Sequence, residues 1–159
     1  MPSNVHTIYS NRHVLSELLP KIDLLIGAVL VVGAKAPKLI DRKLLSIMQP
    51  GSVAVDVSVD QGGCMQTTKP TTHQNPTFIE EGVTHYCVAN MPGAVPYTST
   101  ISLCNATFPH VKDLADYGMT VFKNNDILST GLNTLNGNVT YAAVAESFDL
   151  DYADPLKLL

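Results

Sequence analysis

The residue whose type and setting most clearly indicate chemistry is Asp60. Over residues 53–60, valines alternate with small or polar residues, and this period of two predicts a β-strand. Gly62 and Gly63 follow and allow the backbone to turn tightly. A carboxylate is thereby held where a strand ends, which is the place where open α/β sheets bind ligands. The alternative interpretation is that Asp60 only caps the turn.

Two more apolar stretches end in loops that contain glycine. Residues 24–30 are continuously apolar, which predicts a central strand of a parallel sheet buried on both faces, and residues 31–34 follow it. Residues 84–89 predict another strand, which enters the loop 90–96. Because the carboxyl ends of parallel strands emerge along one edge, the three loops predict the mouth of a nucleotide or small-ligand cleft.

The remaining patterns supply the elements that must hold these loops. A first strand is expected at residues 5–9, and helices at 12–19 and 41–48, the second capped by Asp41. A short helix is expected at 78–81, a long one starting from a cap at Thr98 or Ser99, and shorter ones at 119–125 and 141–147. A turn-rich stretch covers 133–138. This alternation of strands and helices predicts an α/β fold built from βαβ units.

Composition excludes several classes of function. The 159 residues carry a net charge of -4 without a basic stripe, which argues against nucleic acid and membrane surfaces as partners. The longest apolar run, residues 24–34, is too short for a bilayer, which takes about 20 residues. Cys64, Cys87 and Cys104 form no C-x-x-C pair, so we expect reduced thiols in a cytoplasmic protein and no metal site.

Several strings of residues resemble the alanine dehydrogenases. They are Gly-Ala-Lys-Ala-Pro-Lys-Leu at 33–39, Asp-Gln-Gly-Gly-Cys at 60–64, Ala-Asn-Met-Pro-Gly-Ala-Val-Pro at 89–96, and the Gly-Leu-Asn-Thr stretch that opens 131–140. The resemblance implies the second half of a Rossmann-type parallel sheet with flanking helices, followed by C-terminal helices that pack back on the catalytic domain. Residues 1–100 would be a partial NAD-binding domain, and residues 101–159 the C-terminal helical segment of the catalytic domain.

The same resemblance implies an activity. The family interconverts L-alanine, NAD and water with pyruvate, ammonia and NADH, as a homo-oligomer. By position Asp60 matches the catalytic aspartate, which works beside a histidine general acid/base, and Asn90 matches a residue that approaches the substrate. The positions that match the NAD site are Ser10, Val29, Leu30, Val57, Ser58, Val59, Asp60, Lys69, Val88, Ala89, Asn90 and Met91.

The resemblance covers only the second half of the family's length. The residues that bind the substrate carboxylate, the catalytic histidine and the glycine fingerprint belong to the preceding half, so we expect this chain alone to be inactive. His85 falls within a predicted strand and is interpreted as a packing residue. Three hypotheses remain: an enzyme half completed by a separate N-terminal polypeptide, a non-catalytic nucleotide-binding or interaction module, and a truncated remnant. The choice between NAD and NADP also stays open.

Overall fold

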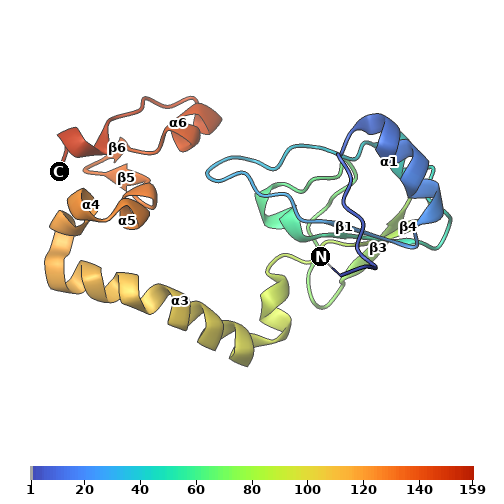
Figure 1. Cartoon of the computed structure of the whole chain (residues 1–159), viewed down its shortest axis with the longest axis horizontal. Helices are drawn as coiled ribbons and strands as arrows, with labels where there is room; N and C mark the ends of the chain where they lie inside the picture. Colours follow the sequence, from blue (N-terminus) through green and yellow to red (C-terminus); the bar gives the residue numbers. More distant parts are fainter. Residues whose placement is uncertain (1) are drawn as a thin grey trace. The chain divides into compact units, whose positions relative to one another are not determined.

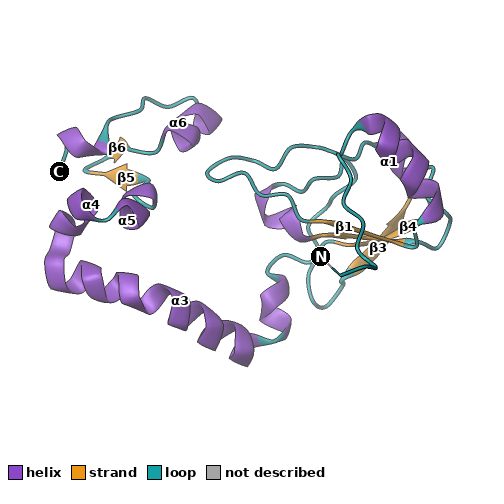
Figure 2. Ribbon diagram, in the orientation of Figure 1, coloured by secondary structure: helices purple, strands orange, loops and turns teal. Residues whose placement is uncertain are grey.

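The computed structural model describes residues 2–159, which divide into two compact units (Figure 1). Unit 1 consists of residues 2–30 and 36–91, and unit 2 of residues 31–35 and 92–159. Both units combine helices and strands, with the larger sheet in unit 1 (Figure 2).

Unit 1 is built on a four-stranded sheet in the order β1-β2-β4-β3. β1 (Leu24–Gly27), β2 (Val53–Asp56) and β4 (Val83–Tyr86) run parallel, whereas β3 (Thr77–Glu80) is antiparallel to β4. Helix α1 (Arg12–Leu18) continues into the 3₁₀ helix η1 (Leu19–Lys21), and α2 (Arg42–Leu45) is capped by Asp41, whose carboxylate accepts the Leu44 N–H at 2.8 Å. The predicted α/β class is thus confirmed, and both N-terminal helices are present, although α2 ends at Leu45 and not at the predicted residue 48.

The first two strand predictions are wrong in part. Residues 5–9 form no strand. β1 is an edge strand and not a central one, because within residues 2–159 it pairs with β2 alone. One of its faces is open: the Leu24 and Ile26 side chains are 52% and 59% exposed. The apolar run over 24–30 therefore signals a strand correctly but not the burial of both its faces.

The predicted helix at residues 78–81 is also wrong, because this segment forms β3 and a hairpin with β4. Glu81 and Gly82 connect the strands with φ values of 55° and 74°, and two successive positive φ angles are the requirement of a tight hairpin turn. Phe78 and His85 are opposite each other in the register, and their rings stack with centroids 4.7 Å apart. This cross-strand pair stabilises the hairpin.

β2 is shorter than predicted. It ends at Asp56, and the chain continues as the 3₁₀ helix η2 (Val57–Gln61). The core of unit 1 joins η1, α2, the sheet and the loops beside them, and its members are Leu19, Ile40, Leu44, Leu45, Met48, Ala54, Cys64, Met65 and Val83.

Unit 2 is mostly helical. The long helix α3 (Pro96–Tyr117) starts earlier than its predicted cap, since Pro96 has the fixed φ that suits a first helical turn. Among the residues that the structure describes, no helix is long and apolar enough to cross a membrane. The other elements are η3 (Met91–Ala94), which begins in unit 1, η4 (Gly118–Thr120), α4 (Val121–Asn124), α5 (Asp126–Thr130), β5 (Thr134–Leu135), β6 (Asn138–Val139), α6 (Ala142–Phe148) and η5 (Pro155–Lys157).

Candidate functional site

The carboxyl ends of β1 and β2 are joined by one serine hydroxyl. Ser58 Oγ accepts the Val29 N–H at 2.7 Å and donates its own proton to the Val29 carbonyl oxygen at 2.8 Å. Ser58 follows β2 and Val29 follows β1. The Ser58 side chain therefore pairs with both the N–H and the carbonyl group of Val29 and joins the two strand ends. Ser58 is buried, with 6% of the residue exposed.

The exits of β2 and β4 meet at Asp60. Its carboxylate accepts the backbone N–H of Asn90 at 3.3 Å. Asn90 adopts a φ of 55°, a left-handed conformation that asparagine tolerates better than most residues. Both Asp60 and Asn90 are exposed. The three strand exits therefore lie along one edge of the sheet, as the sequence predicts.

The Gly-Gly turn after Asp60 has the tight geometry expected of it. Gly62 and Gly63 have φ values of 92° and 77°, and their N–H groups donate to Val59 and Ser58 at 3.0 and 2.9 Å. Lys38 holds the outer side of the turn, because its ammonium donates to the carbonyl oxygens of Gly62 at 2.5 Å and Met65 at 3.0 Å.

A buried carboxylate lies beneath the same turn. Asp56 is fully buried and accepts the N–H groups of Ser58 at 3.0 Å, Cys64 at 2.9 Å and Met65 at 3.4 Å, together with the Thr68 hydroxyl proton. Burial, and then the nearby Asp56 charge, raise the pKa of the Cys64 thiol to about 11. Asp56 is not among the predicted site residues; the signal that could have found it is a charged residue on the same strand face as the buried Ala54.

The positions matched to the NAD site differ in how much of each residue is exposed to solvent. Leu30 and Val57 are 67% and 48% exposed, and each is next in sequence to Val29 or Ser58, the residues joined by the hydroxyl hydrogen bonds. In contrast, Val59 and Val88 lie in the core at 4% and 0% exposure. Ser10, Asp60, Lys69, Ala89 and Asn90 are exposed, and Val29 and Met91 are half-buried. Only part of the set therefore has side chains at the surface.

Lys69 lies in a cluster of charges beside the β3–β4 hairpin. Its ammonium is 2.7 Å from the Glu80 carboxylate and 5.4 Å from the centre of the Phe78 ring. Arg42 pairs with Glu80 and, at 2.6 Å, with Glu81. The hydrogen bonds from Lys69 and Arg42 lower the pKa of Glu80 to about 2.

His85 is a packing residue in this structure, as the sequence indicated. It is fully buried in β4, with Nε2 2.9 Å from the Thr67 hydroxyl and Nδ1 3.0 Å from the Val83 carbonyl oxygen. Both ring nitrogens are therefore occupied within the core.

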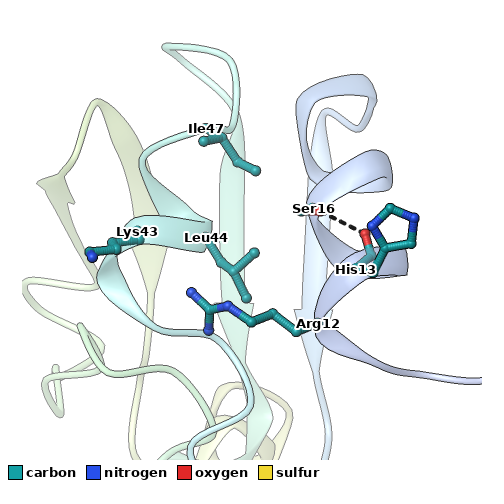
Figure 3. Close-up of a pocket in the computed structure, with 6 residues that line it drawn as sticks. All are labelled: Arg12, His13, Ser16, Lys43, Leu44 and Ile47. Carbon is teal, nitrogen blue, oxygen red and sulfur yellow. Dashed lines mark hydrogen bonds between the residues drawn. The ribbon is translucent and has the colours of Figure 1, made fainter.

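Unit 1 also has a shallow groove of about 490 Å³ between α1 and α2 (Figure 3). It is lined by Arg12, His13, Ser16, Lys43, Leu44 and Ile47, with the Ser16 hydroxyl turned to the His13 carbonyl oxygen. Arg12 is paired with Asp41 at 2.6 Å, so its charge is already engaged. None of the residues matched to the NAD site lines this groove.

Comparison with known proteins identifies the family. The model of the alanine dehydrogenase/PNT C-terminal domain matches residues 1–142. The chain belongs to the alanine dehydrogenase family. It is 54% identical over 154 residues to alanine dehydrogenase of Halomonas elongata, covering 96% of this chain and 42% of that protein. It is 52% identical over 150 residues to alanine dehydrogenase 2 of Staphylococcus aureus, covering 93% of this chain and 40% of that protein.

Solved structures give the same relationship. An L-alanine dehydrogenase superposes with a TM-score of 0.78 at 46% identity, covering 93% of this chain and 41% of that structure. The transhydrogenase from Sinorhizobium meliloti superposes with a TM-score of 0.51 at 28% identity, over 56% of this chain and 26% of its own. The chain thus corresponds to the C-terminal portion of alanine dehydrogenase and spans about two fifths of the length of these relatives.

Proposed function

We propose that this chain forms one wall of the NAD and substrate site of an L-alanine dehydrogenase. The observation that carries the proposal is the meeting of three strand exits through two hydrogen-bonded contacts, Ser58 to Val29 and Asp60 to Asn90. Ligands of open α/β sheets bind at such an edge. Membership in the alanine dehydrogenase family supports the reaction that we propose, in which L-alanine, NAD and water are converted to pyruvate, ammonia and NADH.

The exposed residues at this edge fit a dinucleotide. Leu30 and Val57 present apolar surface, 67% and 48% exposed, next to the polar groups of Asp60 and Asn90. Small-molecule sites combine such apolar walls with a few polar groups that fix orientation. When bound, NAD accepts the hydride of the reaction. The positions that we propose to build the NAD site are Ser10, Val29, Leu30, Val57, Ser58, Val59, Asp60, Lys69, Val88, Ala89, Asn90 and Met91; of these, Ser58, Val59 and Val88 are buried and would support the site from the core.

We assign the proton-handling role to Asp60. Its carboxylate is exposed and is oriented by the Asn90 N–H, which binds Oδ2; within residues 2–159 no donor binds Oδ1, so this oxygen can hold or pass on a proton. A positioned general acid or base contributes about 10²–10⁴-fold in rate. We propose that Asn90, whose N–H donates to Asp60, approaches the substrate. The histidine partner would come from the preceding portion of the family.

We also propose that the chain has two parts and that a further polypeptide completes its site. Residues 1–100 are the partial NAD-binding domain and residues 101–159 the C-terminal helical segment of the catalytic domain. A polypeptide equivalent to the N-terminal portion of the relatives completes the site, and the assembled enzyme is a cytoplasmic homo-oligomer. Without that portion the chain lacks the groups that bind the substrate carboxylate, and we expect no turnover.

The decisive experiment adds the missing portion. The part of the Halomonas elongata enzyme that precedes its match to this chain is expressed separately and mixed with the chain, and NADH formation from L-alanine is followed by absorbance. We expect activity only in the mixture, and none when the chain carries Asp60→Asn. Turnover by the chain alone would refute its inactivity. An inactive mixture whose chain shows no thermal shift with NAD would refute the proposal, since saturation near 100 Kd adds about 2.7 kcal/mol to stability.

A further inference from the structure

We propose that Asp56 is the positioning residue of the site, a buried anchor that fixes where the Asp60 carboxylate lies. The inference rests on the proposed role of Asp60. It concerns a fully buried residue that acts through the turn 57–63. Its basis is the pattern of hydrogen bonds that end on the Asp56 carboxylate.

Those bonds come from both ends of the turn. Oδ1 accepts the N–H of Ser58 at 3.0 Å, two residues before Asp60. Oδ2 accepts the N–H of Cys64 at 2.9 Å and that of Met65 at 3.4 Å, four and five residues after it. The Asp56 carboxylate therefore hydrogen-bonds to backbone N–H groups on both sides of Asp60 and closes the turn that carries it.

The chemistry of this anchor requires a carboxylate. Asp56 is fully buried, and among residues 2–159 it forms no ion pair, so its oxygens are satisfied by hydrogen-bond donors alone. A buried charge without partners is strongly unfavourable. Any opening of the turn removes the donors and exposes that penalty, which restricts the turn to one conformation. An asparagine would present an N–H₂ group to some of the same donors.

Ser58 extends the anchoring to the neighbouring strand. The same residue whose N–H binds Asp56 holds Val29 with its hydroxyl. On the other side, Asp60 accepts the Asn90 N–H at 3.3 Å, so its position relative to the β4 exit depends on the turn. Asp56 thus holds the turn that makes both contacts between the three exits, Ser58 to Val29 and Asp60 to Asn90.

The test compares Asp56→Asn with wild type by amide hydrogen exchange and NMR of the full chain. In the variant we expect the N–H groups of Ser58, Cys64 and Met65 to lose at least about tenfold in protection relative to Thr84 in the sheet. The Asn90 amide resonance serves as the spectroscopic readout of Asp60. We expect it to move toward its position in Asp60→Asn, which defines the signal without the carboxylate.

Two adjacent threonines provide a second, milder comparison if Asp56→Asn does not fold. Thr68→Val removes a donor to Asp56, whereas Thr67→Val removes the contact of the neighbouring threonine with His85. Thr68→Val should lower the protection of Cys64 and Met65 and shift the Asn90 resonance, and Thr67→Val should do neither.

A purely structural role predicts equal loss of protection at all amides and an unshifted Asn90 resonance, and that result would overturn the proposal. The same holds if the two threonine variants behave alike. Titration with NAD separates this inference from the proposed function. If the wild-type chain and the completed mixture bind no NAD, the proposed function fails while the exchange comparison still decides whether Asp56 positions the turn. If NAD binds and the Asp56 variant matches wild type in every readout, only the positioning role fails.

Discussion

Ser58→Ala tests whether the strand exits are held together by a side chain or merely lie close. The substitution removes one hydroxyl that makes two hydrogen bonds to Val29, at 2.7 and 2.8 Å. A hydrogen bond of this kind contributes about 0.5–1.5 kcal/mol net, so the pair contributes about 1–3 kcal/mol. The upper part of this range is expected, because Ser58 is only 6% exposed and water cannot easily replace the lost hydroxyl.

The measurement is equilibrium unfolding in urea, which gives the free energy of unfolding and, through the slope m, a check that the denatured state is unchanged. Ser46→Ala is the matched control, since that exposed hydroxyl donates only to the Lys43 carbonyl oxygen within its own turn. We expect the control to change stability by less than about 0.5 kcal/mol. If Ser58→Ala is as mild as Ser46→Ala at an unchanged m, the two bonds to Val29 do not hold the exits together and our interpretation of the edge is incorrect.

Three more predictions follow from the geometry of unit 1. The pKa of Glu80 is lowered from 4.5 to about 2, so its ion pairs stabilise the fold above pH 4.5 and this stabilisation is lost as the pH falls toward 2. Thermal melts should show a melting temperature that declines over this range, and the decline should be shallower in Glu80→Gln. Gly63→Ala should lower the free energy of unfolding in urea more than Gly62→Ala does. Both glycines have positive φ, which disfavours alanine by about 1–2 kcal/mol, but of the two only Gly63 would bring the new Cβ into collision with a threonine side chain. Equal losses of stability in the two variants would contradict this. A thiol reagent at neutral pH should label Cys104, which is exposed, and spare Cys64, which is buried and has its pKa raised to about 11; mass spectrometry of the labelled peptides checks it.

The fold class could be predicted from local patterns because residues 53–60 alternate with a period of two and residues 24–30 are continuously apolar, and both patterns indicate strands. Asp41 as a helix cap and the glycine turn after Asp60 are read directly from residue types. What failed depends on neighbours in space. The segment at 78–81 has no strong period of its own, and its strand state depends on pairing with β4 and on the turn at Gly82. The exposure of Ile26 depends on which strands lie beside β1.

The candidate site was predictable in place but not in its internal bonds. Glycine-containing exits of parallel strands indicate the edge of the sheet, and this edge is where Asp60 and Asn90 meet. A family resemblance adds residue positions. It does not distinguish a residue that contacts the cofactor from one that only holds the neighbouring backbone in place. Ser58 matches a cofactor position, but the structure shows its hydroxyl bonded on both sides to Val29. Such a division of roles follows only from distances.

The alternative interpretation of Asp60, that it merely caps the turn, is answered by the residue four positions earlier. Asp56 ends β2, and its carboxylate accepts the Ser58 N–H at the start of η2, which is the capping bond. It also accepts the Cys64 N–H where the turn closes. A turn with its donors already satisfied has no need of a second carboxylate. Among the residues that the structure describes, the Asp60 carboxylate at the exposed edge accepts one backbone N–H, that of Asn90, and in this setting an acidic side chain is available for a ligand.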